Sequence, residues 1–163
     1  GYLGGDPHSA EEMLDASYQS GKAIQLTRTT AAHAMSYMLT KRLGLAHGHA
    51  CMLTLPILWE RMQEREEMIP VLDDLSAKMR LGDRRMGPKL LRGILYELEM
   101  EIPPVPGESV LDELAASVNT ERLNNHPVAM TREEIKAVYR ASMIPPPDNI
   151  RQACIDIWKY YGR

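Results

Sequence analysis

Residues 29–56 of the chain read TTAAHAMSYMLTKRLGLAHGHACMLTLP and hold three of its five histidines. Apolar residues recur at helical spacing over 31–43, and Gly44 can adopt the left-handed conformation that ends a helix. A second helix is expected over about 48–65, bent at Pro56 because proline has no amide donor. Two helices joined by a glycine turn predict an antiparallel hairpin.

Helical patterns continue on both sides of this hairpin. Ser9 and Glu12 have the spacing of a capping box that opens a helix running to the threonines near residue 29. Further helices are expected over 73–79, 87–100 and 109–118, after the capping box of Thr131 and Glu134, and after Asp148. No segment alternates apolar and polar residues for long enough to predict a strand. The sequence therefore predicts an all-α fold, a helical bundle.

The C-terminal end of the sequence differs in composition from the rest. Three consecutive prolines at 145–147 predict a rigid spacer. After it, Ile150, Cys154 and other apolar residues recur along one helical stripe. We therefore expect a helical domain over 1–144, followed over 145–163 by a proline spacer and an amphipathic helix.

Composition excludes several classes of function. The 163 residues are 44% hydrophobic and 25% charged, with a net charge of -3, which is ordinary for a globular domain. Without a basic surface, nucleic acid is not an expected partner. No apolar run approaches the roughly 20 residues that span a bilayer, so a membrane is not expected either.

Cysteine usage indicates a reducing environment. Cys51 and Cys154 lie far apart in the chain, and neither has a second thiol at metal-ligand spacing. The N-terminal residues carry no basic segment followed by an apolar one, so they do not resemble a secretory signal. A cytoplasmic location is the resulting expectation.

The two helices of the hairpin each carry a histidine where they meet. His33 lies on the first helix and His47 opens the second, so the hairpin can bring both imidazoles to one point. Neutral imidazoles suit Fe(II) or Zn(II), but a stable site needs at least one or two more ligands. The positions four residues before the histidines hold no carboxylate: they are Gly4, Thr29, Leu43, Leu45 and Arg122. The spacing therefore predicts only part of a metal site.

A simpler interpretation of the same residues stays open. His33 caps a helix or packs in the core, while His47 and His49 are polar loop residues. His49 follows His47 by two positions, which places it on a different side of a helix. Spacing alone favours this interpretation, because lone histidine pairs are frequent and closed metal sites are rare.

As a string, residues 29–56 resemble the signature of the iron-containing alcohol dehydrogenases. In that family a helical histidine is followed by a glycine turn and then by a His-Gly pair. Upstream, MLDASYQSGKAI at 13–24 is similar to the helix that precedes the signature. Downstream, VNTERLNNHPVAMTREEIKAVYRASM at 118–143 is similar to the closing segment of the family. The resemblance covers about 130 residues in order, and it implies the C-terminal helical domain shared by these dehydrogenases and dehydroquinate synthase-like proteins.

This resemblance implies a function and its cofactors. His33 and His47 correspond to two of the family's four metal ligands. The other two, an Asp and a His one helical turn apart, are expected upstream of Gly1. A nucleotide-binding domain that holds NAD or NADP is expected there too, as the partner of this domain. The chain is then part of a metal-dependent alcohol dehydrogenase or aldehyde reductase with Fe(II) or Zn(II), inactive alone, acting on a small alcohol or aldehyde; a homodimer is a further expectation.

One position departs from the family pattern. Many members carry a histidine four residues after the one matched by His33, thought to move a proton at the alcohol oxygen, and here that residue is Tyr37. A phenol is a weaker proton carrier than an imidazole at neutral pH, so Tyr37 is either a catalytic group or a wall of the pocket. The pattern HAMSYxLT at 33–40 also resembles a branch associated with phosphonate-bearing aldehydes, such as phosphonoacetaldehyde.

Two other functions compete with the dehydrogenase. A lyase of the dehydroquinate synthase type uses zinc and a phosphorylated sugar acid, and needs Lys and Arg contacts to the phosphate. Near His33 the sequence offers only Lys41 and Arg42 for that purpose. The other alternative is a helical interaction domain that keeps the scaffold without the chemistry.

Overall fold

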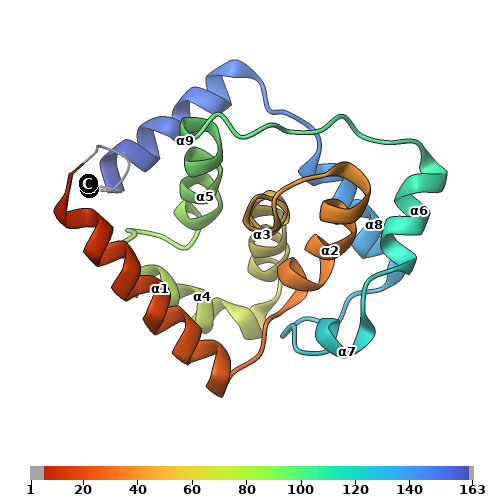
Figure 1. Cartoon of the computed structure of the whole chain (residues 1–163), viewed down its shortest axis with the longest axis horizontal. Helices are drawn as coiled ribbons and strands as arrows, with labels where there is room; N and C mark the ends of the chain where they lie inside the picture. The colour runs from red at the N-terminus through yellow and green to blue at the C-terminus, as the bar shows by residue number, and fades with distance from the viewer. Residues whose placement is uncertain (1–5, 162–163) are drawn as a thin grey trace.

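A computed structural model describes residues 6–161, and these residues form helices without any strand (Figure 1). The helices in chain order are α1 (His8–Leu26), α2 (Ala31–Leu43), α3 (His47–Gln63), the 3₁₀ helix η2 (Glu66–Met68), α4 (Ile69–Lys78), α5 (Met86–Glu97), α6 (Glu108–Ala116), α7 (Thr120–Leu123), α8 (Arg132–Ser142) and α9 (Asp148–Tyr161). The all-α prediction is confirmed. In the described part of the chain, no helix is both long and apolar enough to cross a membrane.

The predicted hairpin of α2 and α3 lies at the centre of the molecule (Figure 1). Gly44 closes α2 with a φ of 70°, and its N–H donates to the carbonyl of Thr40 at 3.1 Å. This is the left-handed ending that favours glycine. Met35 and Leu39 of α2 are fully buried in the main core, so the face of α2 opposite the solvent anchors the hairpin.

Helix α8 packs against α3 and α6 and contributes to the main core. It begins with the predicted capping box, in which Thr131 and Glu134 each accept a hydrogen bond from the other's backbone. The hydroxyl of the fully buried Tyr139 donates to the carbonyl of Met35 at 2.8 Å. This contact ties α8 to the helix that carries His33.

Helix α9 packs along α5 on the other side of α3 (Figure 1). The two backbones approach so closely at Gly93 that an added Cβ would lie 2.7 Å from Cβ of Trp158 and would overlap the carbonyl of Cys154. Cys154 is buried in this contact, as the predicted apolar stripe requires. Glycine is therefore needed at 93 for the helices to meet.

Helix α1 differs from its sequence-based description. It begins at His8, whose N–H donates to Asp6 Oδ1 at 3.0 Å, and Ser9 lies inside the helix with its hydroxyl donating to the carbonyl of Asp6. The expected capping box of Ser9 and Glu12 is therefore wrong. The apolar residues of α1 are exposed, with Leu14 at 73%. Ser9 is the one buried residue of this helix.

Helix α4 begins at Ile69, four residues before the expected start, because Pro70 is well suited to a first helical turn. The short helices η2 and α7 have no counterpart in the sequence-based expectations. Helix α7 matters for the site described next, because it brings a charged side chain to α2.

Candidate metal centre

The imidazole rings of His33 and His47 lie in direct contact. Their centroids are 4.6 Å apart and the ring planes meet at 76°. His33 comes from the first turn of α2 and His47 is the first residue of α3, so the turn at Gly44 brings the two rings together. The structure thus confirms that the hairpin juxtaposes the two imidazoles.

Ser36 fixes the orientation of His47. Its hydroxyl lies 2.8 Å from the carbonyl oxygen of His33 and 3.1 Å from Nδ1 of His47. The carbonyl can only accept, so the single hydroxyl proton of Ser36 is directed to it. The Ser36 oxygen then accepts from Nδ1–H of His47, which leaves the lone pair of that ring on Nε2. A histidine held by its other nitrogen in this way is the usual form of a metal-ligating imidazole.

The surroundings of His33 favour its neutral form. Burial lowers the pKa of its imidazole, and the neighbouring charges of His47 and Arg122 lower that pKa further. Its Nδ1 atom is buried and has no hydrogen-bond partner among the described residues. A neutral ring with an unused ring nitrogen suits a metal ligand, since a metal binds the deprotonated imidazole nitrogen.

The donor set is incomplete within residues 6–161. No group of three or more His, Cys, Asp or Glu side chains there is arranged to hold a metal ion. Cys51 comes nearest, with its Sγ 3.8 Å from Nε2 of His47. Burial raises the pKa of the Cys51 thiol, which disfavours the thiolate that a metal requires. The described residues therefore fit a divalent metal as two of its ligands.

Tyr37 lies beside both histidines and is contacted by a cation. Its ring centroid is 5.2 Å from that of His33 and 5.7 Å from that of His47. The guanidinium of Arg122, from α7, lies over the Tyr37 ring with Cζ 4.7 Å from the centroid, and its Nη1 donates to the phenol oxygen. Tyr37 is thus placed at the site as expected, whereas Arg122 was not predicted.

An open cavity of about 550 Å³ adjoins this group of side chains. His33, Tyr37, Arg122 and Arg28 line it, together with Asn125. The expectation that Lys41 and Arg42 are the only basic residues near His33 is therefore wrong.

Arg42 is already engaged: its guanidinium forms an ion pair with Glu113 of α6. The cations that line the cavity come instead from the segment before α2 and from α7. Arg28 lies just before α2 in the chain, whereas Arg122 is far from His33 in sequence and is brought to the cavity by folding.

The remaining histidines do not join the pair. His49 follows His47 on α3, and its buried Nε2 has no partner among the described residues. His126 is buried in the loop after α7, where burial lowers the pKa of its ring. No ring contact connects either residue to His33 or His47 within residues 6–161.

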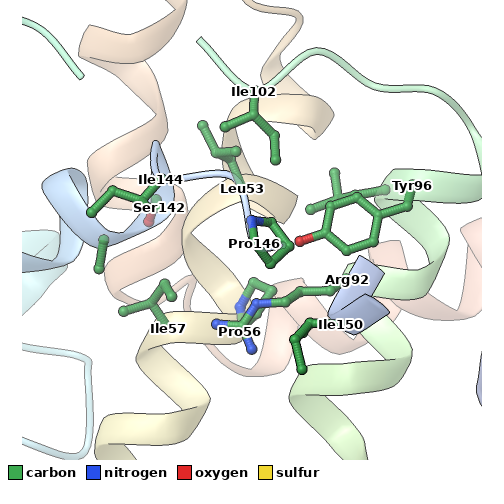
Figure 2. A pocket seen from close by; sticks show the side chains of 12 residues that line it. Leu53, Pro56, Ile57, Arg92, Tyr96, Ile102, Ser142, Ile144, Pro146 and Ile150 are labelled. Carbon is green, nitrogen blue, oxygen red and sulfur yellow. The ribbon is translucent and has the colours of Figure 1, made fainter. Parts of the chain in front are cut away.

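A second cavity, of about 270 Å³, lies between α3, α5, α8 and the proline segment (Figure 2). Its lining is largely apolar, and two of its polar side chains, Arg92 and Ser142, are already engaged. Arg92 forms a two-pronged ion pair with Glu60, with the Nη2–Oε2 contact at 2.8 Å. The hydroxyl of Ser142 donates to the carbonyl of Val138 at 2.7 Å. None of the site residues expected from the sequence lines this cavity.

Three residues at the histidine pair were missed by the sequence argument. Ser36 and Cys51 follow His33 and His47 by three and four positions, so helical spacing could have indicated both. Arg122 is 85 residues from Tyr37 in the chain. No local pattern indicates that contact.

Comparison with known proteins agrees with this geometry. The model of the Fe-containing alcohol dehydrogenase family, C-terminal, matches residues 3–143. A phosphonoacetaldehyde reductase of Streptomyces viridochromogenes (strain DSM 40736 / JCM 4977 / BCRC 1201 / Tue 494) is 62% identical over 40 residues, which are 24% of this chain and 10% of that protein's length. No solved structure matches the chain. The chain belongs to the Fe-containing alcohol dehydrogenase family, and the match is to the family's C-terminal region.

Proposed function

We propose that this domain is the metal-bearing part of an NAD- or NADP-dependent aldehyde reductase or alcohol dehydrogenase, and that His33 and His47 each supply one ligand to Fe(II) or Zn(II). The observation that carries the proposal is the direct contact of the two rings, 4.6 Å apart, from neighbouring helices. The lowered pKa of His33 and the orientation of His47 by Ser36 support it. Family membership supplies the class of reaction.

The remaining parts of the enzyme are assigned to the same full-length protein. Its nucleotide-binding domain holds the nicotinamide cofactor and is the partner of this helical domain. The donor set here stops at two imidazoles, so the other ligands come from outside residues 6–161. A domain with half a metal site and no cofactor site is inactive alone.

The residues of this domain bind the metal ion and orient the substrate, and none of them reacts with the substrate. A bound divalent ion supplies Lewis-acid stabilisation of the substrate oxygen. A reduced nicotinamide, held by the nucleotide-binding domain, would supply the hydride for reduction of the carbonyl carbon. His33 and His47 would hold the ion from two neighbouring helices, Ser36 orients the His47 ring, and the adjoining cavity would admit a small substrate.

The substrate proposed is a short aldehyde that carries a phosphonate group. The relative with 62% identity is described as a phosphonoacetaldehyde reductase, although the aligned segment spans a tenth of its length. The resemblance of residues 33–40 to the same branch supports the same substrate class.

Metal analysis of the full-length protein tests the proposal. Purified protein is expected to hold about one equivalent of iron or zinc and to oxidise NADH or NADPH when an aldehyde is added. His33→Ala and His47→Ala are each expected to lower metal content to a small fraction and to remove turnover. His49→Ala, in the same helical turn as His47, is the matched control and should leave both unchanged. Unchanged metal content and turnover in both single variants would contradict the proposal.

A further inference from the structure

Arg122 places a positive charge one aromatic ring away from the histidine pair. Its guanidinium covers the Tyr37 ring, and the Tyr37 ring lies 5.2 Å and 5.7 Å from the rings of His33 and His47. The guanidinium also donates to the phenol oxygen, so both its position and its tilt are set by Tyr37. When an arginine is held by stacking and by a hydrogen bond, the orientation of its remaining planar N–H donors is restricted.

No carboxylate neutralises this arginine within residues 6–161. The ion pairs of the described residues engage arginines such as Arg42, Arg92 and Arg140, each with a glutamate, but none includes Arg122. Its neighbour Glu121 makes a single contact of 3.9 Å to Arg28, between side chains 83% and 73% exposed. An exposed pair at that distance is weak. The charged residues that line the cavity are Arg28, Arg122 and Glu121, so the lining as a whole has an excess of positive charge.

The guanidinium of Arg122 is separated from the histidine pair only by the Tyr37 ring. A metal cation bound by His33 and His47 would therefore be repelled by this positive charge. An anion in the adjoining cavity removes this repulsion, because it attracts both the guanidinium and the metal. The site is thus arranged for a substrate with a negative group close to its reacting end.

We propose that Arg122, positioned by Tyr37, recognises the phosphonate group of a short phosphonate-bearing aldehyde whose carbonyl lies at the histidine pair. This inference rests on the proposed function and assigns the residue that selects its substrate. Guanidinium forks bind phosphonate and phosphate oxygens with two parallel hydrogen bonds. In phosphonoacetaldehyde one methylene separates the aldehyde carbon from phosphorus, so the phosphonate lies close to the reacting carbonyl. Asn125 lines the same cavity and offers an amide donor.

The proposal also explains the departure from the family pattern at Tyr37. An imidazole at that position would lack the phenol oxygen that accepts from Arg122. Tyr37 is accordingly a positioning residue for Arg122. The cost of losing a hydrogen bond to a charged group, about tenfold to a hundredfold in affinity, sets the size of the effect expected from removing the guanidinium.

The test compares charged and uncharged ligands on the full-length protein. Calorimetry measures the dissociation constant of 2-hydroxyethylphosphonate, the alcohol product, and steady-state assays measure KM for phosphonoacetaldehyde and for acetaldehyde. Arg122→Gln is expected to weaken both phosphonate ligands about tenfold to a hundredfold, while KM for acetaldehyde changes less than about twofold. Arg122→Lys should recover part of the loss. The control is Arg85→Gln, whose side chain makes no ion pair within residues 6–161, and it should match the wild type.

The remaining outcomes contradict either the inference about Arg122 or the proposed function. Equal affinity of wild type and Arg122→Gln for 2-hydroxyethylphosphonate overturns the inference, as does a wild-type protein that does not bind this ligand. Preference for a carboxylate-bearing aldehyde such as succinic semialdehyde also overturns it. If binding depends on Arg122 but the protein holds no metal and reduces no aldehyde, the anion site stands and the proposed function fails.

Discussion

The hydroxyl oxygen of Ser36 lies 3.1 Å from Nδ1 of His47, so the helix that carries one histidine also orients the other. Ser36 is fully buried and also donates to the carbonyl of His33. Position 36 therefore acts on the proposed metal site through His47. This hydrogen bond favours the His47 tautomer that leaves Nε2 free to bind a metal.

Ser36→Ala is expected to weaken metal binding about tenfold to a hundredfold, the usual effect of removing a group that orients a ligand. The measurement is a competition titration with a chromophoric zinc chelator on the full-length protein. Ser142→Ala provides the control, since Ser142 makes a comparable hydrogen bond to the backbone within α8. Equal zinc affinity in both variants would show that Ser36 does not orient a ligand.

Tyr37→Phe distinguishes a positioning residue from a proton relay. The phenyl ring keeps the wall of the cavity and loses the oxygen that accepts from Arg122. We expect kcat for acetaldehyde to change less than about threefold at every pH between 6 and 9, whereas loss of a proton relay removes about a hundredfold or more. KM for phosphonoacetaldehyde should rise. A loss of kcat of relay size with an altered pH profile would assign Tyr37 a catalytic role instead.

Gly93→Ala tests the contact of α5 with α9. The added methyl group would lie 2.7 Å from Cβ of Trp158, and the backbone of Cys154 on the same side cannot move away as a flexible side chain could. Such overpacking costs about 1–3 kcal/mol. Thermal or urea unfolding of the full-length protein measures it.

Gly21→Ala is the matched control for that experiment. Position 21 is a helical glycine with nothing within 4 Å of an added Cβ. Alanine there is expected to stabilise the protein by about 0.5–1 kcal/mol through helix propensity. Equal stability changes for the two variants would contradict the close approach of α5 and α9.

His126 is expected to make stability depend on pH. Burial lowers the pKa of its imidazole in the folded state below the unfolded value of 6.5. The unfolded chain therefore takes up the proton first, and the free energy of unfolding falls as the pH drops from 6.5 toward the folded pKa. Chelator-treated full-length protein, unfolded by urea between pH 7.5 and 5.5, should lose stability across this window.

The His126→Asn variant should lose less stability over the same window. Part of the loss remains, because the pKa of His33 is also lowered by burial. The carboxylates with lowered pKa values, such as Glu134, titrate below their usual value of 4.5 and do not contribute above pH 5.5. A loss in the variant as large as in the wild type would exclude His126 as its source.

Local signals predicted most of the fold. Gly44 ends α2 in the predicted left-handed conformation, and the capping box at Thr131 opens α8, because each depends on residues within one turn. The similar pattern at Ser9 failed since Asp6 and Pro7 upstream start the helix earlier. Sequence-based capping signals cannot rank two competing starts a few residues apart.

The sequence predicted the part of the site that lies on two helices adjacent in the chain, and it missed the part that lies elsewhere. His33 and His47 are joined by one tight turn, so their meeting follows from the sequence of the hairpin. Arg122 reaches Tyr37 from 85 residues away through the packing of α7 on α2. Asn119 caps α7 and is a local signal for that helix, but no local pattern indicates the contact of Arg122 with Tyr37, so the cation at the site required the folded structure.

The proposed function requires His33 and His47 to bind the same metal ion. The decisive measurement is a crystal structure of the full-length protein with zinc, with anomalous data collected at the zinc edge. We expect a single anomalous peak bonded to one ring nitrogen of each histidine, at about 2.0–2.1 Å. A peak at other side chains, or zinc bound with either ring outside its coordination shell, would contradict it.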